Sequence, residues 1–447
     1  MANLPLGETG VRPEGVPIGS RLELFVDHGL IDRLDGAQLK MHAPQQAPPS
    51  PSPVKGYYMT VIKDGERYRA YYRDHVAGTQ ALHGDGDPNE ITCYAESRDG
   101  HIWTYPQLGI HEVHGPQGSN VILANTAPCS HNFSPFLDTR PGVPAAERFK
   151  ALAGTYDGGQ GGLFAFVSGD GIHWKKMAEH PVIRSEHRAF DSQNVAFWSE
   201  SEGCYACYYR TWSTPRGGLR TITRTVSTDF VHWSAATPME ANVASEHLYT
   251  NNTHPYFRAP HIYIALPTRF LPKRGNATDI LLMTSRGGRR YDRLFMEAFI
   301  RPGLGVDRWG DRANYVALNI VPTGPAEMSV YHAPSGRRYT LRTDGLASVN
   351  AGYAGGEMVT KALEFSGCEL VLNYSTSAAG SVCLEVQSPD GTALPNYSLA
   401  DCKPLVGDEI ERVVHWRHGT GMEGLAGIPV RLRLVLQDAD VYSIRFR

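Results

Sequence analysis

The sequence predicts an all-β protein, with a five-bladed β-propeller followed by a C-terminal β-sandwich. Three observations predict this fold: a turn motif that recurs along the first two-thirds of the chain, β-hairpins at the same interval, and a change of pattern after about residue 345. Helical periodicity is nearly absent from the 447 residues, and short apolar runs end in Gly, Pro and Asn turns. Evenly spaced short strands of this kind are typical of propellers, barrels and sandwiches.

The recurring motif reads Ser, any residue, Asp, Gly, two residues and an aromatic residue. It begins at Ser97 and Ser168, and less complete copies begin at Ser227 and Ser285, at separations of 71, 59 and 58 residues. Such a near-constant period indicates a repeat architecture. Asp and Gly suit a tight turn between strands, and the aromatic ring can anchor the hairpin. We therefore expect the aspartates of this motif to be structural and to lie on the outer edge of each repeat.

Each period also contains a hairpin upstream of the turn motif, and a fifth hairpin follows the last copy. The five predicted hairpins are 57–62 with 68–74, 133–137 with 149–156, 195–199 with 204–212, 255–258 with 261–269, and 328–332 with 338–344. They predict five blades within residues 1–344. The early strand 22–27 could complete the fifth blade and close the ring, which would remove exposed strand edges. The Pro-rich stretch 41–56 between them is expected to be an extended linker.

The C-terminal part, residues 345–447, has a different pattern of apolar residues. Segments such as 370–374, 382–386 and 430–436 alternate or run apolar, and turns such as Ser388-Pro389-Asp390-Gly391 separate them. This pattern predicts a β-sandwich of about 100 residues.

The overall composition limits the classes of partner. The net charge of −3 does not indicate a nucleic acid partner, and no apolar run approaches the roughly 18–20 residues that span a bilayer.

Cys204 and Cys207 lie in a strand-like segment, where residues three apart point to opposite faces. We therefore expect these two cysteines to be buried thiols, and we expect the protein to hold neither a metal nor a cofactor. The first 20 residues lack the apolar stretch of a secretion signal, which leaves a cytoplasmic location, or export after removal of a signal, both open. The oligomeric state also stays open.

The turn motifs together with the trailing sandwich resemble the superfamily of five-bladed propeller glycoside hydrolases that includes arabinanases, β-xylosidases, invertases and levanases. The resemblance implies hydrolysis of glycosidic bonds by three acids: an Asp at the start of the first blade, an Asp in the second and a Glu in the third. This chain departs from that pattern, because its first blade begins Lys55-Gly56-Tyr57-Tyr58 and carries no carboxylate there.

Propeller geometry selects the candidate catalytic residues. The residues just before the first strand of a blade and just after its second strand lie at the same end of the ring, so they converge although they are distant in sequence. Glycoside hydrolysis needs two carboxyl groups, a general acid and a base or nucleophile, and their separation decides inversion or retention. The carboxylates that the sequence places at this end are Asp191, Glu246, Glu327 and Asp74.

The same positions supply candidates for substrate binding. Sugar hydroxyls need polar partners, sugar faces stack on aromatic rings, and several arginines would suit a carboxylated or sulfated sugar. The candidate substrate-binding residues are His131, Asn132, Arg73, Arg210, Trp212, Asn252, His254 and Arg269.

These observations favour a glycoside hydrolase that acts on the ends of a plant or algal oligosaccharide or polysaccharide. Two alternatives stay open. One is a carbohydrate-binding propeller without catalysis. The other is a sialidase-like or lyase-like enzyme that acts on an acidic sugar, which needs a tyrosine such as Tyr156 or Tyr249 at the floor of the pocket, among arginines.

Overall fold

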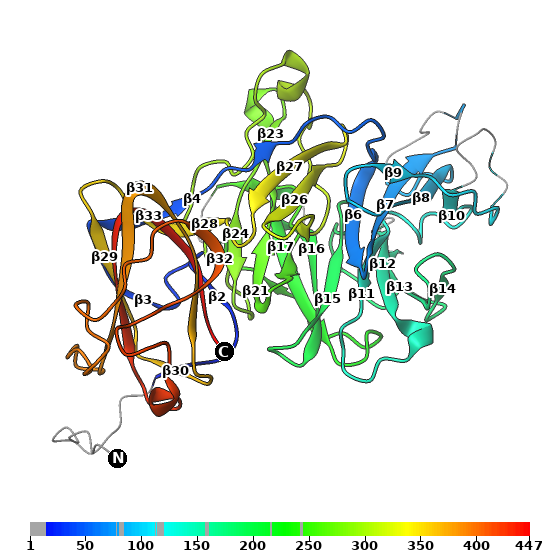
Figure 1. Cartoon of the computed structure of the whole chain (residues 1–447). Coiled ribbons are helices and arrows are strands. Elements are labelled where there is room, and N and C mark those ends of the chain that lie inside the picture. Colours follow the sequence, from blue (N-terminus) through cyan, green and yellow to red (C-terminus); the bar gives the residue numbers. More distant parts are fainter. Residues whose placement is uncertain are drawn as a thin grey trace. The chain divides into compact units, whose positions relative to one another are not determined.

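The computed structural model describes residues 15–76, 78–79, 85–111, 113, 120–156, 161–214, 217–241 and 245–447. Apart from short 3-10 turns, the regular structure of these residues is β (Figure 1). No helix in the described ranges is long and apolar enough to cross a membrane. The chain forms two compact units: one contains Ala43–Leu341, and the other combines the segments Met1–His42 and Arg342–Arg447.

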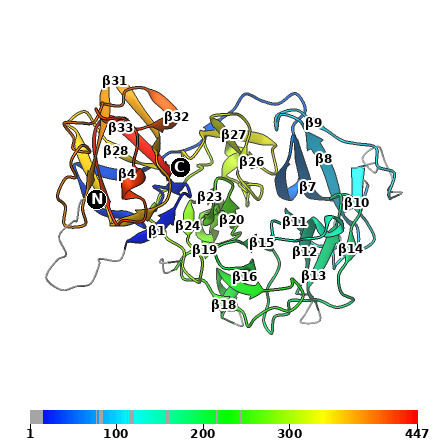
Figure 2. The ribbon, with the colours of Figure 1, turned by 60° about the horizontal axis from the view of Figure 1, so that its bottom comes forward.

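The first unit is a five-bladed β-propeller, as predicted, and Figure 2 shows its sheets arranged in a ring. Each of the first three blades has consecutive antiparallel strands, which run in sequence order from the inside outward. Blade one contains β6 (Tyr57–Asp64), β7 (Arg67–His75) and β8 (Glu90–Ser97), with β9 (Trp103–Thr104) and β10 (Val121–Leu123) both paired to β8. Blade two contains β11 (Ser134–Leu137), β12 (Phe149–Thr155), β13 (Gly162–Ser168) and β14 (Lys175–Lys176). Blade three contains β15 (Val195–Ser199), β16 (Cys204–Thr214), β17 (Gly217–Ser227) and β18 (Thr237–Pro238).

The last two blades are less regular. Blade four contains β20 (His254–Tyr256), β21 (Ala259–Ala265) and β24 (Met283–Ser285), and a separate small sheet contains β19 (His247–Leu248), β22 (Thr268–Leu271) and β23 (Ala277–Ile280). Blade five contains β25 (Val321–Pro322), β26 (Glu327–His332), β27 (Arg337–Arg342) and β5 (Gln45–Gln46). The predicted fifth hairpin therefore supplies the second and third strands of its blade. The inner strand is the apolar run before it, where Val316 pairs with His332.

The ring is closed by β5, which corrects the prediction for residues 22–27. Gln45 and Gln46 pair antiparallel with Thr340 and Tyr339, so the start of the propeller sequence forms the outermost strand of its last blade. Two prolines, Pro48 and Pro49, follow β5 after Ala47, and within sheets proline is confined to edges, first residues of strands and bulges. Within 22–27, β2 (Glu23–Leu24) instead pairs with β33 (Arg431–Phe446) of the other unit, and Phe25 is buried in the core of that unit.

The second unit is a β-sandwich that contains the N-terminal strands as well as the C-terminal ones. Its main sheet has the order β3 (Ile31–Asp35), β29 (Gly356–Thr360), β33, β28 (Ala347–Ala351) and β4 (Ala37–Met41), and β33 also pairs along its length with β31 (Leu370–Gln387). β31 pairs in turn with β32 (Asp408–Val413), and β1 (Val16–Gly19) pairs in parallel with β30 (Leu363–Phe365). Alternate residues of β33, such as Leu432, Leu434 and Leu436, are fully buried, as expected for a strand with one face on the core. The prediction of 345–447 for this unit omitted the segment before His42.

The turn motifs adopt the predicted tight conformation in each of the first three blades. In blade two, Ser168 Oγ accepts a hydrogen bond from the amide of Gly171 at 2.9 Å, and Asp170 Oδ1 accepts two from the amides of Ile172 and His173, both at 2.8 Å. Burial alone would raise the pKa of Asp170, but these bonds and one from the His173 ring lower it well below its usual range. The aspartate therefore stabilises the turn.

Replacing Asp170 by Ala should remove two backbone hydrogen bonds and lower the free energy of unfolding by about 1–2 kcal/mol. Urea denaturation measures this change, and Asp170→Asn is the matched control, since its amide oxygen can still accept from the backbone. Equal stability of the Ala variant and the wild type would show that the turn does not need this carboxylate.

Candidate functional site

One end of the propeller ring carries a polar pocket formed by residues of blades one and five together with Tyr249, which precedes blade four. We call it the axial pocket; it has a volume of about 350 Å³ and is lined by Tyr57, Tyr58, Arg73, Tyr249, Asp311, Arg312, Tyr315, Ala333 and Pro334. These residues lie at the start of inner strands or at the end of second strands. This is the end at which the sequence predicted a ligand site.

Three tyrosines form one wall of the axial pocket. The rings of Tyr58 and Tyr315 are 6.2 Å apart between centroids, and those of Tyr249 and Tyr315 are 5.6 Å apart. Burial alone would raise the pKa of Tyr249, but the guanidinium groups of Arg210 and Arg312 lower it. The pKa of Tyr58 is raised instead, because burial and the neighbouring Tyr249 outweigh the opposing effect of Arg73. Aromatic faces next to polar groups are the surfaces on which sugar rings stack.

A buried hydrogen-bond network holds the first two blades together beside the pocket. Arg73 donates to Asn132 Oδ1 at 2.8 Å and forms an ion pair with Glu90 at 3.2 Å. His131 Nδ1 lies 2.7 Å from the second oxygen of Glu90. Asn132 has a φ of 51°, a left-handed conformation that asparagine tolerates better than most residues. Arg73, His131 and Asn132, which the sequence predicted as ligand-binding residues, thus come together around Glu90.

Asp191 lies in the segment that leads into the inner strand of blade three. Its carboxylate is buried and forms ion pairs with Arg210 and, at 3.5 Å, with Arg188. Gln193, two residues later, donates to Thr60 Oγ1 at 2.9 Å and to the Met59 carbonyl at 3.2 Å. These bonds fix the Asp191 segment against the inner strand of blade one.

Asp85 is a carboxylate that the sequence reasoning missed. It lies 3.8 Å from Nε2 of the buried His131, with its side chain 39% exposed. Burial raises the pKa of Asp85, His131 opposes this effect, and the negative charge of Asp191 raises the pKa further. Asp85 and Asp191 are therefore electrostatic neighbours. The sequence could have indicated Asp85 by its position in the loop between the second and third strands of blade one, because this loop lies at the same end of the ring.

Three of the four predicted acids lie elsewhere. Asp74 follows Arg73 on β7, so it points to the opposite face of the strand, and it accepts a hydrogen bond from the amide of His75. Glu246 is held by Arg293 and lies 3.8 Å from Arg269. Glu327 begins β26, at the far end of the ring, where Arg338 holds it at 2.7 Å. The error at Glu327 comes from the misassigned strands of blade five.

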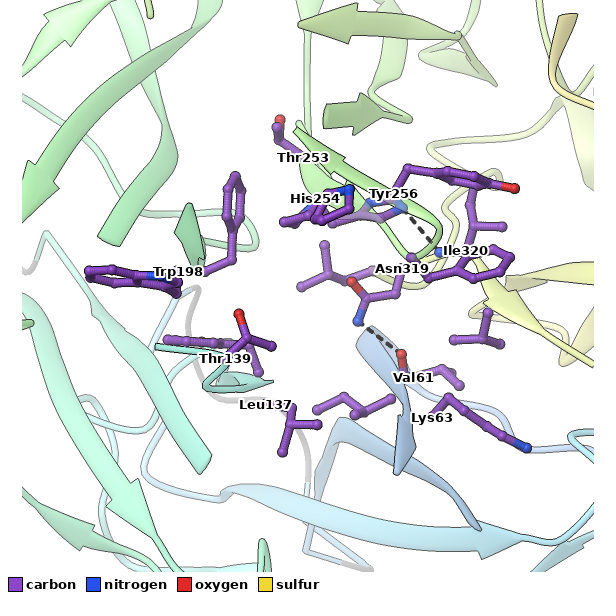
Figure 3. A pocket seen from close by; sticks show the side chains of 18 of the residues that line it. Val61, Lys63, Leu137, Thr139, Trp198, Thr253, His254, Tyr256, Asn319 and Ile320 are labelled. Carbon is purple, nitrogen blue, oxygen red and sulfur yellow. Dashed lines mark hydrogen bonds between the residues drawn. The ribbon is translucent and has the colours of Figure 1, made fainter. Parts of the chain in front are cut away.

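Three of the predicted ligand-binding residues also have structural partners. Arg269 pairs with Asp279 through two nitrogens, at 2.9 and 2.5 Å. Asn252 donates to the Val316 carbonyl at 2.7 Å. His254 lines a second hollow of about 320 Å³, shown in Figure 3. This hollow is formed by the later halves of the inner strands, so it lies at the opposite end of the ring from the axial pocket.

Trp212 lies on β16, and three arginines approach its ring: Arg220 at 4.5 Å, Arg188 at 5.7 Å and Arg210 at 6.0 Å from the centroid. Arg210 lies two residues earlier on the same strand, and its guanidinium is 4.4 Å from the ring centroid of Tyr249. The residues described by the structure contain no cluster of three or more His, Cys, Asp or Glu side chains placed to hold a metal ion.

The sequence matches no protein-family model and no curated protein. The fold is similar to several solved structures. An arabinoxylan arabinofuranohydrolase of glycoside hydrolase family 43 from Bacillus subtilis is 14% identical at a TM-score of 0.42, covering 88% of this chain and 96% of that one. An endo-arabinase from Bacteroides thetaiotaomicron is 12% identical at a TM-score of 0.40, and the match covers 66% of this chain and 96% of that one. An N-acetylgalactosamine deacetylase from F. plautii is 13% identical at a TM-score of 0.43, and the match covers 88% of this chain and 95% of that one.

The similar structures therefore include glycoside hydrolases of the superfamily that the sequence resembles, together with an enzyme of a different reaction class.

His254 should make the stability of the propeller depend on pH. Its Nδ1 bonds to the Asn252 carbonyl and its Nε2 accepts from the Ile320 amide, so the buried ring is neutral, and burial lowers its pKa to about 4. In the unfolded chain the pKa is about 6.5, so the unfolded state binds more protons between these values. We expect the free energy of unfolding to fall by up to about 3 kcal/mol as the pH drops from 6.5 to 4.

Urea denaturation of the wild type and His254→Gln across this pH range measures the effect, and the exposed His180→Gln is the matched control. The His254 variant should be less stable at pH 7.5 but lose less stability on acidification. Equal pH slopes in all three proteins would contradict the assignment.

Proposed function

We propose that the protein is a glycosidase whose active site is the axial pocket, with Asp85 and Asp191 as its catalytic carboxylates. One arrangement carries the proposal: two acidic side chains from different blades reach this end of the ring, Asp85 at 3.8 Å from His131 Nε2 and Asp191 against Arg210, and the charge of Asp191 raises the pKa of Asp85. Glycoside hydrolysis needs such a pair, with one group able to donate a proton and the other charged.

The surroundings of the two carboxylates differ in a way that assigns their roles. Asp85 is partly exposed, and burial and Asp191 raise its pKa, which suits the general acid that protonates the leaving oxygen. Asp191 is buried against Arg210 and held by the bonds of Gln193, which suits the charged base or nucleophile. His131 contacts Asp85 and Glu90, and thereby positions the acid.

The shape and lining of the pocket support a sugar as the substrate. Its volume lies near the lower limit of ligand pockets, roughly 300–1,000 Å³, which favours one or two sugar rings over a long chain. Tyr57, 55% exposed, and Tyr58 offer aromatic faces, and Arg73 and Arg312 offer donors for hydroxyl groups. We propose action at chain ends, on an oligosaccharide or polysaccharide of plant or algal origin.

Replacing either carboxylate by its amide should lower kcat/KM by about 100-fold or more, because each variant loses acid–base or nucleophilic catalysis. The assay measures turnover of a panel of aryl glycosides and native oligosaccharides by Asp85→Asn and Asp191→Asn. Asp74→Asn is the matched control, because Asp74 lies in the same blade and points away from the pocket. Undiminished turnover in either pocket variant rejects that residue's role.

The general acid can be distinguished from its partner by the leaving group. An acidic leaving group needs no proton, so Asp85→Asn should retain much of the wild-type rate on nitrophenyl glycosides and little on native oligosaccharides. Wild-type activity on oligosaccharides should fall as the pH rises through the raised pKa of Asp85, and this basic limb should disappear in the variant. A rate loss that is equal for all leaving groups would contradict the acid role.

A second candidate function is β-elimination on an acidic sugar, and the lowered pKa of Tyr249 favours it. A phenol held between Arg210 and Arg312 can serve as the base that abstracts a proton beside a carboxylate. The bond from the β-carbon to the glycosidic oxygen then breaks, the leaving oxygen takes up a proton, and a carbon–carbon double bond conjugated with the carboxylate forms, so ultraviolet absorbance of the products detects the reaction. Tyr249→Phe should abolish such a product while leaving a hydrolase largely active.

A further inference from the structure

Arg220 lies in an unusual setting next to the axial pocket. It lies on β17 directly across from Trp212 on β16, so both side chains share one face of blade three. Its guanidinium carbon is 4.5 Å from the ring centroid of Trp212, 4.6 Å from that of Phe270 and 5.0 Å from that of Tyr249. Tyr249 also lines the axial pocket, so the Arg220 group borders the proposed sugar site.

The other arginines of this end each have a carboxylate partner. Arg73 pairs with Glu90 at 3.2 Å, Arg210 pairs with Asp191, and Arg312 pairs with Asp311 at 2.9 Å. Within the described part of the chain, Arg220 has no ion pair, and its buried Nε has no hydrogen-bond partner. Among the described residues at this end of the ring, Arg220 is therefore an arginine without a carboxylate in ion-pair contact, and the charge of Asp191 acts on it only from a greater distance.

A cation in this position is costly without an anion. Aromatic faces stabilise a guanidinium through cation–π contact, but they satisfy none of its N–H donors. Burial lowers the pKa of Arg220 and the neighbouring Arg210 lowers it further, which outweighs the opposing effects of Tyr249 and Asp191, so the charge lies in a partly desolvated environment beside another cation. A bound anion would supply both the missing charge and the missing hydrogen-bond acceptors.

We propose that Arg220 binds the carboxylate of a uronic acid, so that the substrate is a sugar bearing a carboxylate. This inference rests on the proposed function, because it places the anionic sugar next to the axial pocket. A planar guanidinium and a planar carboxylate form two parallel hydrogen bonds, and an indole face such as Trp212 packs against a sugar ring. A sulfated sugar presents a tetrahedral anion and is the alternative that the experiment separates.

Calorimetric titration of the whole protein tests the proposal with four sugars that cannot be hydrolysed: glucuronate, galacturonate, glucose and glucose 6-sulfate. At least one uronate should bind more tightly than glucose and glucose 6-sulfate. The advantage should shrink by about 10- to 100-fold in Arg220→Gln, because a charged hydrogen-bonded pair is lost. Arg220→Lys should retain part of it, since it keeps the charge and loses the planar fork.

Arg289→Gln is the matched control, because Arg289 is an exposed arginine of the same propeller, and its ion pair with the exposed Glu240, at 3.5 Å, lies on the protein surface. It should bind uronates as the wild type does. Circular dichroism and the urea midpoint show whether Arg220→Gln stays folded, and Arg220→Lys supplies the comparison if it does not.

The outcomes separate this inference from the proposed function. Uronate binding that depends on Arg220, without hydrolysis of any glycoside, supports the inference and rejects the glycosidase. Hydrolysis that depends on Asp85 and Asp191, with no preference for uronates and no effect of Arg220→Gln, rejects the inference alone. Tighter binding of glucose 6-sulfate than of both uronates would overturn the assignment of a carboxylate.

Discussion

The pairing of β5 with β27 is the contact on which the rest of the propeller depends. It joins the first residues of this unit to its last blade, so blade five becomes a neighbour of blade one. Without ring closure, Tyr58 of blade one and Tyr315 before blade five, which share one wall of the axial pocket, would lie at opposite ends of an open array of sheets. Ring closure also leaves no free inner edge on which another chain could add a strand.

Hydrogen bonds between inner strands also link neighbouring blades near the site. The amide of Val61 donates to the Leu318 carbonyl at 3.1 Å, and Asn319 Nδ2 donates to the Val61 carbonyl at 2.9 Å, which links blades one and five. Gln193 links blade three to blade one, and Asn252 links the segment before β20 to blade five. The polar side chains at the axis therefore serve two purposes, since some hold the ring together and others face the pocket.

The sequence indicated the fold class because the turn motif and the hairpins are local patterns. Their hydrogen bonds lie within a few residues, so each copy can be interpreted without knowing its neighbours. Ring closure is not local in this sense: a two-residue strand beside a Pro-rich stretch has no pattern of its own, and only pairing with β27 defines it. The same limit explains Glu327, because the inner strand of blade five was overlooked and the end of the ring was then assigned wrongly.

The candidate site shows a related limit. Position in a blade predicts the end of the ring at which a residue lies, so residues that adjoin inner or second strands could be assigned to this end: Asp191, Arg210, Arg73, His131 and Asn132. Their roles stay predictions. Asp85 was missed because it lies within a long loop, and a loop's path depends on contacts such as the one to His131. The same rule also selected Glu246 and Arg269, but Arg293 holds Glu246 and Asp279 holds Arg269.

Charge pairing is what divides the residues of this end into structural and functional groups. Removing a buried ion from water is expensive, so a folded chain retains a buried charge where a partner offsets that cost or where function requires it. Glu246 and Arg269 have partners that account for them. Asp85, whose pKa is raised beside Asp191, and Arg220, enclosed by three rings, are less well balanced by their described neighbours. Both lie next to the residues of the axial pocket, and an anionic sugar would bring the carboxylate that Arg220 lacks and the glycosidic oxygen that Asp85 could protonate.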